Sequence, residues 1–253
     1  VYWPAFLKSA GLPAPKAIFG HGFLLHRGEK MSKSTGNVVD PIELAERYGT
    51  DQLRYFLLAE VPFGKDGSFS DEAIVTRCNA ELANSFGNLA QRVLSMVFKN
   101  LEGKLTGDLP LSPADAELSA VVAGELATMQ ERFHALAFSE GIEAWMRAVF
   151  ACNAYVDEQA PWALKKTDPE RMKAVLQTLF VALRDLAIAI QPVVPVKAAA
   201  LLDQLGIPAE ERGYAALGDS EWFTRLVAQG FTVAPPTALF PRLELPAEDE
   251  SAA

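Results

Sequence analysis

The sequence predicts a mainly α-helical protein in which an antiparallel helical bundle follows a shorter segment of mixed α and β pattern. Two observations predict this arrangement. From residue 70 onward, apolar residues recur every three or four positions through several long stretches, as they do on the core face of bundle helices. Short links join these stretches, and helices joined by short links pack antiparallel. Of the 253 residues, 50% are hydrophobic, which is enough for a sizeable core.

Composition and charge exclude several classes of protein. No apolar stretch approaches the roughly 18–20 residues that a membrane-spanning helix needs, so we expect no membrane partner. The net charge is −9, and it is concentrated in residues 106–253, which carry 11 basic against 21 acidic side chains. An acidic chain attracts phosphate backbones poorly, so any contact with nucleic acid should be local and specific.

The two cysteines, Cys78 and Cys152, are too few for a disulfide framework and lack the spacing of metal ligands. Both lie in helical patterns, so we expect buried thiols, no metal site and a cytoplasmic location. The chain begins Val1-Tyr2-Trp3-Pro4, without an initiator methionine or a signal peptide, which indicates a piece of a longer protein.

The elements before residue 70 follow from local patterns. Residues 16–26 form a β-type apolar run, and its glycines, Gly20 and Gly22, indicate a bulge or a close approach of another backbone. A polar loop over 27–37 follows the run. Two helices come next, the first begun by an N-capping aspartate and a proline and ended before a glycine. They cover about Asp40–Tyr48 and Asp51–Glu60.

Five helices are predicted after residue 70, and each begins at a capping side chain or a proline. The expected starts of the first four are Ser70, Ser112, about Ser139 and Asp168, and Pro192 and Pro195 begin a shorter fifth that ends near Leu205. The first carries a core stripe of Leu82, Phe86, Leu89, Val93 and Met96. Trp3 and Trp145 are expected to be packing residues. The last 45 or so residues are rich in Gly, Pro and Glu, which predicts a wrapping segment with a disordered tip.

The loop from Glu29 to Asn37 carries the sharpest chemical pattern. It offers two lysines three positions apart, Lys30 and Lys33, together with hydroxyl groups and a glycine. Lysine is a compact point charge that suits phosphate oxygens, and hydroxyls and loop amides can complete such a site. An arbitrary loop with two lysines would be a solvated basic turn, but the ordered string K-M-S-K-S followed by T-G-N favours phosphate chemistry.

Residues Lys30–Ser34 read K-M-S-K-S and resemble the signature of class I aminoacyl-tRNA synthetases, and the flanking residues resemble the methionyl-tRNA synthetase family in particular. The similar stretches are Val1–Leu7, His21–Leu24 and Gly49–Leu57, the last with Gln52 where the family has alanine. The resemblance implies three parts. Residues 1–67 would end an α/β, Rossmann-like catalytic domain, 68–205 would be the anticodon-binding bundle, and 206–253 a C-terminal segment with an acidic tail.

The resemblance also implies roles for the loop. Lys30 and Lys33 would be catalytic, because the family's loop lysines stabilise the transition state in which the methionine carboxylate attacks the α-phosphate of ATP. Six residues would contact ATP: Lys30, Met31, Ser32, Lys33, Ser34 and His21. From the residues alone, Met31 is better interpreted as a packing anchor of the loop. Ser32 and Ser34 are expected either to orient the loop or to contact phosphate.

A second set of polar residues follows one flank of the helix that begins at Ser70. Asn84, Asn88 and Arg92 lie about 200–280° from Leu82 on a helical wheel, off the core face. Such amides and guanidinium groups can read the edges of unstacked bases, although a plain solvated face has the same spacing. Trp162 follows Pro161 at a helix end, where it is either a core residue or a stacking platform. The similarity of both stretches to the family's anticodon-recognition elements implies that Asn88, Arg92 and Trp162 contact the anticodon of methionine tRNA.

The implied function is that of a methionine–tRNA ligase, which uses ATP with Mg²⁺, methionine and methionine tRNA. The family's HIGH motif, methionine pocket and any zinc site would lie upstream of Val1, so we expect this chain to bind the anticodon but not to catalyse alone. Two alternatives stay open: another class I synthetase, of the leucyl, isoleucyl, valyl or cysteinyl type, and a non-catalytic tRNA-binding helical module. The sequence predicts neither the oligomeric state nor the use of zinc.

Overall fold

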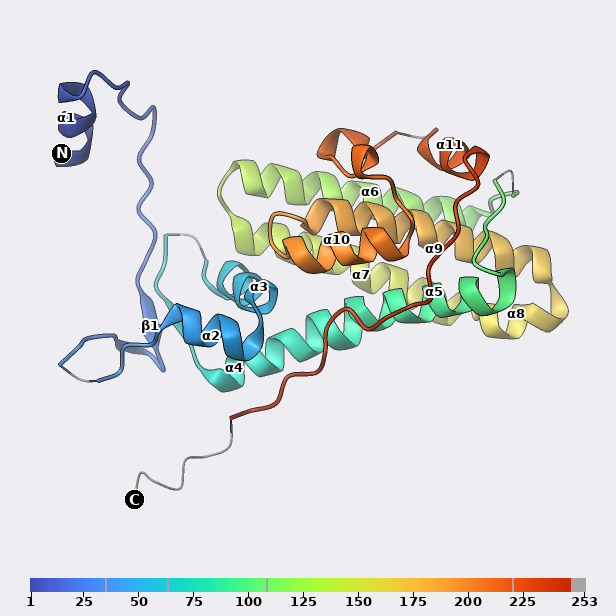
Figure 1. Cartoon of the computed structure of the whole chain (residues 1–253), viewed down its shortest axis with the longest axis horizontal. Coiled ribbons are helices and arrows are strands. Elements are labelled where there is room, and N and C mark those ends of the chain that lie inside the picture. Colours follow the sequence, from blue (N-terminus) through green and yellow to red (C-terminus); the bar gives the residue numbers. More distant parts are fainter. Residues whose placement is uncertain (35, 63, 108, 220, 247–253) are drawn as a thin grey trace.

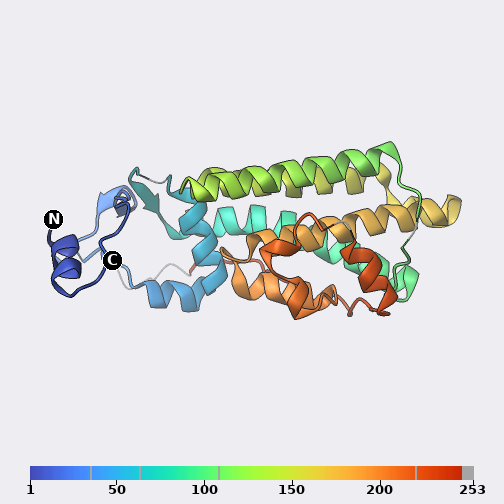
Figure 2. The ribbon, with the colours of Figure 1, turned by 90° about the horizontal axis from the view of Figure 1, so that it is seen from above.

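The long helices form a bundle, and the N-terminal elements stand at one end of it (Figure 1). This computed structural model describes residues 1–34, 36–62, 64–107, 109–219 and 221–246. Turned by 90°, the molecule is elongated, with α6 along one side of the bundle and α10 along the other (Figure 2). Within the described residues, no helix is both long enough and apolar enough to cross a lipid bilayer.

The predicted bundle is confirmed. One continuous helical rod comprises α4 (Asp71–Arg77), a π-helical segment η1 (Cys78–Gly87) and α5 (Asn88–Leu101). The remaining bundle elements are α6 (Pro113–His134), α7 (Phe138–Gln159), α8 (Pro161–Thr167), α9 (Pro169–Ile190) and α10 (Pro195–Gln204). Ser70, Ser112 and Asp168 each accept a hydrogen bond from a backbone amide of the first turn, as N-caps do.

Two details of the bundle differ from the sequence-based expectation. The π-helix was not predicted. Its hydrogen bonds join residues five apart instead of four, whereas an apolar pattern reveals only the 3.6-residue repeat of the α-helix. Here Ser85 donates its hydroxyl to the carbonyl of Ala80, five residues back, at 2.8 Å. The second difference is at the end of the core stripe: its residues from Leu82 to Val93 are buried, but the stripe ends on the buried Val97, while Met96 is only partly buried.

The core runs through the whole bundle. Trp145 is fully buried, and its indole N–H donates to the carbonyl of Leu186 at 3.0 Å, so it is the packing residue that was expected. Both thiols are also buried, as expected, and burial raises the pKa of Cys78 and of Cys152 to about 12. These cysteines therefore stay neutral at physiological pH and behave as small apolar residues.

The N-terminal part contains α1 (Tyr2–Ser9), β1 (Leu24–His26), β2 (Glu29–Lys30), α2 (Pro41–Tyr48), α3 (Thr50–Glu60) and β3 (Gly67–Phe69). The three strands form a sheet in the order β2-β1-β3, with β1 antiparallel to β2 and parallel to β3. The apolar run 16–26 is a strand only over its last three residues. Gly22 does mark a close approach, since a Cβ atom there would lie 2.0 Å from the carbonyl oxygen of Lys65.

The packing role expected for Trp3 is wrong in this structure. Its side chain is 77% exposed, because α1 stands at the end of an extended arm, away from the bundle (Figure 1). The indole lies near the ring of Phe6 in the same helix, with 6.5 Å between ring centroids. A tryptophan in an apolar pattern indicates burial only when a surface is present to cover it.

The C-terminal segment wraps back along the bundle, as expected. After α11 (Trp222–Ala228), an extended strap over 229–246 returns beside α5 and η1 (Figure 1). Asn79 fixes the strap with two hydrogen bonds to the backbone of Leu243, at 2.8 and 2.9 Å. The predicted disordered tip falls on residues 247–253, which lie outside the described residues. The proposed domain limits at residues 67 and 205 stay predictions.

A buried ion pair joins three helices at the far end of the bundle. The carboxylate of Asp115, at the start of α6, accepts two hydrogen bonds from the guanidinium of Arg171 on α9, at 2.6 and 2.7 Å. The hydroxyl of Tyr155 on α7 donates to the same carboxylate. Burial opposes the charged form, but these hydrogen bonds outweigh it and lower the pKa of Asp115 to about 2. Arg171 also donates to Gln159, the last residue of α7, at 2.8 Å.

Asp115→Asn should therefore destabilise the fold and change its acid response. Breaking a buried ion pair costs about 3–5 kcal/mol. Because the folded pKa lies below the ordinary value of 3.8, the stability that Asp115 contributes is present above about pH 4 and lost as the pH falls toward 2. Urea unfolding at several pH values should show that the variant lacks this part of the acid response.

Glu125→Gln is the matched control, since Glu125 also lies on α6 and pairs with an arginine, Arg147 of α7, at 2.8 Å, but on the surface. Its loss should cost less than about 1 kcal/mol. Equal losses in the two variants would contradict the role given to the buried pair.

Candidate nucleotide loop and anticodon surface

The strand pair β1–β2 positions the lysine-rich loop. Leu25 faces Lys30 and His26 faces Glu29, so Arg27 and Gly28 form a two-residue turn, with φ of 52° and 82°. Both values lie in the left-handed region that such hairpin turns require. The amide of Gly28 also donates to the Ser68 hydroxyl of β3 at 2.8 Å. The sequence predicted one polar loop here, whereas the structure places its first residues in a tight hairpin.

One asparagine closes the base of the loop. The side-chain oxygen of Asn37 accepts from the amide of Ser32 at 2.8 Å, and its nitrogen donates to the carbonyl of Lys30 at 3.2 Å. The hydroxyls of Ser32 and Ser34 lie 2.7 Å apart. Thr35 lies outside the described residues. The sequence marked Asn37 only as the end of the loop pattern, yet its side chain joins the two sides of the loop.

The two lysines reach the surface from opposite ends of the loop. The ammonium group of Lys30 lies 5.4 Å from the centroid of the Phe23 ring, and Lys33 is exposed. Met31, between them, is half-buried and packs on the core beside Leu24 and Leu44, so it anchors the loop. The structure thus brings the five residues Lys30–Ser34 together on one support, with Lys30, Lys33 and Ser34 exposed and Ser32 partly buried.

His21 precedes this hairpin. Its imidazole is exposed, and Nδ1 lies 2.8 Å from the carbonyl oxygen of Gly22. The residue lines a cavity of about 270 Å³ together with Leu57 and Phe138. Its assignment to ATP stays a prediction, as do those of the loop residues.

The second candidate site lies where α7 ends and α8 begins. Ala160 takes a left-handed conformation with φ of 43°, and Pro161 then occupies the first position of α8, where it is buried. A proline suits this position because its missing N–H would have no helical partner. The chain turns sharply here, and Trp162 emerges from the corner with 50% of its surface exposed. The core alternative for this tryptophan is therefore wrong.

Arg92 and Trp162, which are 70 positions apart in the sequence, lie side by side. The guanidinium carbon of Arg92 is 5.3 Å from the indole centroid, within the range of a cation–π contact. Asp157 on α7 accepts a hydrogen bond from the same guanidinium at 2.7 Å. The sequence pattern gave Asp157 no role, although a carboxylate five positions before the tryptophan is well placed to hold the arginine.

The two asparagines border a cavity of mixed polar and apolar lining on the same helical rod. Asn84 and Asn88 are exposed and line a cavity of about 620 Å³ with Gln91 and the strap residues 238–240. Gly87 lies at its floor, where a Cβ atom would be 2.9 Å from the Leu82 carbonyl oxygen. The π-helix thus lies directly before the site, and π-helical turns frequently occur at functional sites.

Comparison with known families covers most of the chain. The family described as "tRNA synthetases class I (M)" matches residues 1–94, and the one described as "Anticodon binding domain of methionyl tRNA ligase" matches residues 107–252. The chain belongs to the methionyl-tRNA ligase family. Its match to the family's anticodon-binding domain includes Trp162, and its match to the synthetase domain includes the loop and both Asn88 and Arg92.

Individual relatives agree with this membership. The methionine–tRNA ligase of Brucella suis is 50% identical, over 96% of this chain and 46% of its own length. That of Mycobacterium tuberculosis is 49% identical, over 99% of this chain and 48% of its own length. The chain thus spans about half the length of the curated relatives it matches. A solved structure of M. tuberculosis methionyl-tRNA synthetase in complex with methionyl-adenylate matches with a TM-score of 0.86 at 49% identity, over 96% of this chain and 47% of that one.

The exposure of Trp162 leads to a test of stability. Trp162→Ala should lower the melting temperature only slightly, because half of the indole is already in contact with water. Trp145→Ala, the same substitution at a fully buried position, should cost about 3–5 kcal/mol. Thermal unfolding followed by circular dichroism measures both. A loss at Trp162 as large as that at Trp145 would mean that the corner depends on the indole for its fold.

Proposed function

We propose that this chain supplies the nucleotide loop and the anticodon-binding domain of a methionine–tRNA ligase, which activates methionine with ATP and transfers it to methionine tRNA. The observation that carries the proposal is the presence, in one member of this family, of an intact K-M-S-K-S loop and of the Arg92–Trp162 pair. The M. tuberculosis relative was solved as a complex with methionyl-adenylate, which supports the use of ATP and methionine.

In the proposed first step, the methionine carboxylate attacks the α-phosphate of ATP, the bond to the β-phosphate breaks, and pyrophosphate leaves. Negative charge grows on the phosphate oxygens as this happens. Lys30 and Lys33 would stabilise that charge, because both ammonium groups stand at the surface of a loop whose backbone Asn37 holds. Ser32, Ser34 and His21 would contact the nucleotide, while Met31 keeps the loop on the core.

Magnesium enters this proposal as part of the substrate, bound to the phosphates of ATP. Within the described residues, no group of three or more His, Cys, Asp or Glu side chains lies close enough together to hold a metal ion.

Anticodon recognition would use the second site. An exposed indole is a stacking platform for a base, and Trp162 is oriented by Arg92 on its face. The amide of Asn88, one helical turn before Arg92, can donate to and accept from a base edge. The chain alone should bind tRNA without activating methionine, since its relatives are about twice as long. The buried free thiols suit the cytoplasmic location that the proposal includes.

The loop assignment predicts a rate effect in the ligase that contains this chain. Lys33→Ala should slow adenylate formation by about 10²–10³-fold, the typical loss when one charge-stabilising donor is removed. The affinity for methionine should hardly change. Methionine-dependent exchange of pyrophosphate into ATP measures the rate, and Lys99→Ala, an exposed lysine on α5, is the control. A wild-type rate in Lys33→Ala would refute the assignment.

The anticodon assignment predicts an effect on affinity. Stacking on an aromatic side chain is worth roughly 1–3 kcal/mol per base, so Trp162→Ala should weaken binding of methionine tRNA by about one to two powers of ten. Filter binding to this chain measures the affinity, and Trp3→Ala, the same change at an exposed residue at the other end of the molecule, should leave it unchanged. Unaltered discrimination against a tRNA with a changed anticodon would contradict the role of Trp162.

A further inference from the structure

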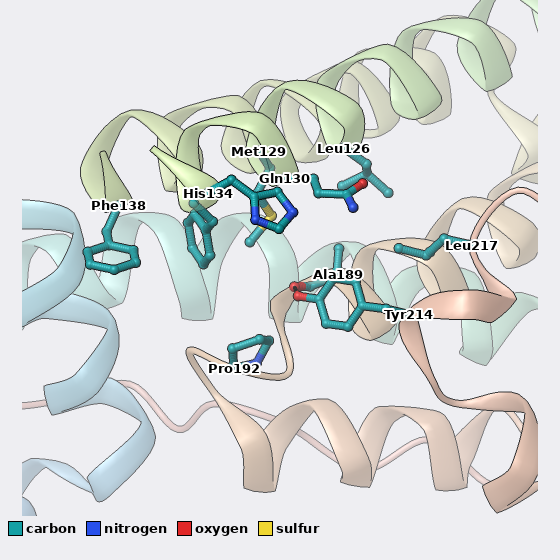
Figure 3. Close-up of a pocket in the computed structure, with 10 residues that line it drawn as sticks. Leu126, Met129, Gln130, His134, Phe138, Ala189, Pro192, Tyr214 and Leu217 are labelled. Atoms are coloured by element: carbon teal, nitrogen blue, oxygen red, sulfur yellow. Dashed lines mark hydrogen bonds between the residues drawn. The ribbon is translucent and has the colours of Figure 1, made fainter. Parts of the chain in front are cut away.

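A cavity of about 430 Å³ lies between the bundle and the C-terminal segment (Figure 3). Its walls come from the C-terminal half of α6, the start of α7, the end of α9 and residues around 214–217. Among the described residues, it shares no lining side chain with the lysine-rich loop or with the Trp162 corner. Small-molecule sites usually measure about 300–1,000 Å³, so this cavity is large enough for a ligand.

Aromatic and sulfur-containing side chains form the inner wall. Phe133 and Phe138 meet edge to face, with 5.4 Å between ring centroids, and Met129 lines the same cavity. Phe133 rests directly on the backbone of α7, since a Cβ atom at Gly141 would lie 2.4 Å from its ring. This wall is therefore fixed in place, and its composition suits a flat aromatic guest, because thioethers and aromatic edges both attract aromatic rings.

Hydrogen bonds hold the opposite wall away from α6. The hydroxyl of Tyr214 donates to the carbonyl of Ala189. Gln191 donates to the carbonyl of Arg212 at 2.7 Å, and the buried Arg184 donates to that of Ala216 at 3.0 Å. The segment could close over the cavity only by giving up these bonds to α9 and the residue after it. The cavity is therefore preformed, which lowers the cost of binding.

Two polar side chains define the remaining edge. Figure 3 shows the amide of Gln130 and the imidazole of His134 on the α6 side, across the cavity from Tyr214. Of the residues that line the cavity in the described part of the chain, none is Asp, Glu, Lys or Arg. A charged guest would lose its hydration without gaining a partner of opposite charge. A neutral ring with one hydrogen-bonding group gains both the apolar wall and the Gln130 amide.

We propose that this cavity is a binding site for a small, neutral, bicyclic heteroaromatic molecule. Its ring lies against Met129 and Phe133, and its hydrogen-bonding edge faces Gln130. This role is separate from the proposed ligase chemistry. The guest also contacts Pro192, whose carbonyl oxygen accepts a hydrogen bond from Arg54 of α3 at 2.6 Å. The site therefore borders the contact between the bundle and α3, the second helix after the nucleotide loop.

Methyl-labelled methionine provides the readout. The chain contains five methionines, and among them Met129 alone lines this cavity, so the others serve as internal references. Indole added to the full chain should move the Met129 methyl signal in a saturable way, with a dissociation constant on the order of 1 mM. No saturable movement of that signal with indole would overturn the proposal.

Substitutions at the edge test the location. Gln130→Trp should fill the cavity from an exposed helix position and weaken indole binding by about tenfold or more. Glu131→Trp places the same side chain on the next residue, which does not line the cavity, and should leave binding unchanged. Because both positions are exposed on α6, neither change should threaten folding. Equal effects of the two substitutions would overturn the proposed location.

A matched pair of probes tests the chemistry. Gln130→Leu removes the polar edge with little change in side-chain size. It should weaken the binding of indole about threefold to tenfold, the usual effect of losing one hydrogen bond. Its affinity for 1-methylindole, which has no N–H to donate, should stay the same. An equal loss for both probes would overturn the role given to the Gln130 amide.

Discussion

The burial of α9 is the constraint on which the rest of the fold depends. Fifteen of its 22 residues are buried, and α5, α6, α7, α8 and α10 all pack against it. Arg184, in the C-terminal half of this helix, is fully buried, and a buried guanidinium is costly unless it is paired. Asp185 pairs with it at 2.7 Å, and the Trp222 ring lies 4.2 Å from its carbon. The C-terminal segment supplies further partners to this guanidinium, through the carbonyl of Ala216 and the Trp222 ring, and is held against α9 by them.

A second set of polar contacts joins the loop-bearing part to this bundle. Asp51, near the start of α3, accepts a hydrogen bond from the amide of Lys197 at 2.6 Å and so caps the first turn of α10. Arg54, one turn later, donates to the carbonyls of Pro192 and Val193. Both side chains bind backbone groups of the α9–α10 turn, so this junction depends on the fold of the turn more than on its side chains.

Apolar periodicity predicted the bundle well because its long helices bury one face each. The starts at Ser70, Ser112 and Asp168 were predictable because a capping side chain acts on its own first turn. The exposure of Trp3 was not predictable, because it depends on whether distant residues cover the indole. Strand β2 has only two residues, which is too short for an alternating pattern to reveal it. The core stripe was predicted correctly from Leu82 to Val93, but its last member was placed on Met96 instead of the buried Val97.

The candidate sites likewise contain residues that the sequence could identify and residues that it could not. Resemblance selected Lys30, Lys33, Arg92 and Trp162, and the structure places each at the surface or partly so. Resemblance did not select Asn37 or Asp157, because each acts through a hydrogen bond that forms only in the folded chain. Asn37 bonds to Ser32, and Asp157 bonds to Arg92. The cavity beside Met129 had no counterpart in the sequence pattern, since it arises from four segments of the chain.

The π-helical segment also determines how α5, the helix that follows it, is rotated about the axis of the rod. Each π-turn holds an additional residue, so α5 leaves η1 rotated relative to the course that an unbroken α-helix would take. Deleting one residue within Cys78–Gly87 would let the rod wind more tightly and would swing Arg92 around its axis, away from the Trp162 ring. A single insertion or deletion in this stretch therefore changes the position of Arg92, which follows the segment on α5, without altering Arg92 or Trp162 themselves.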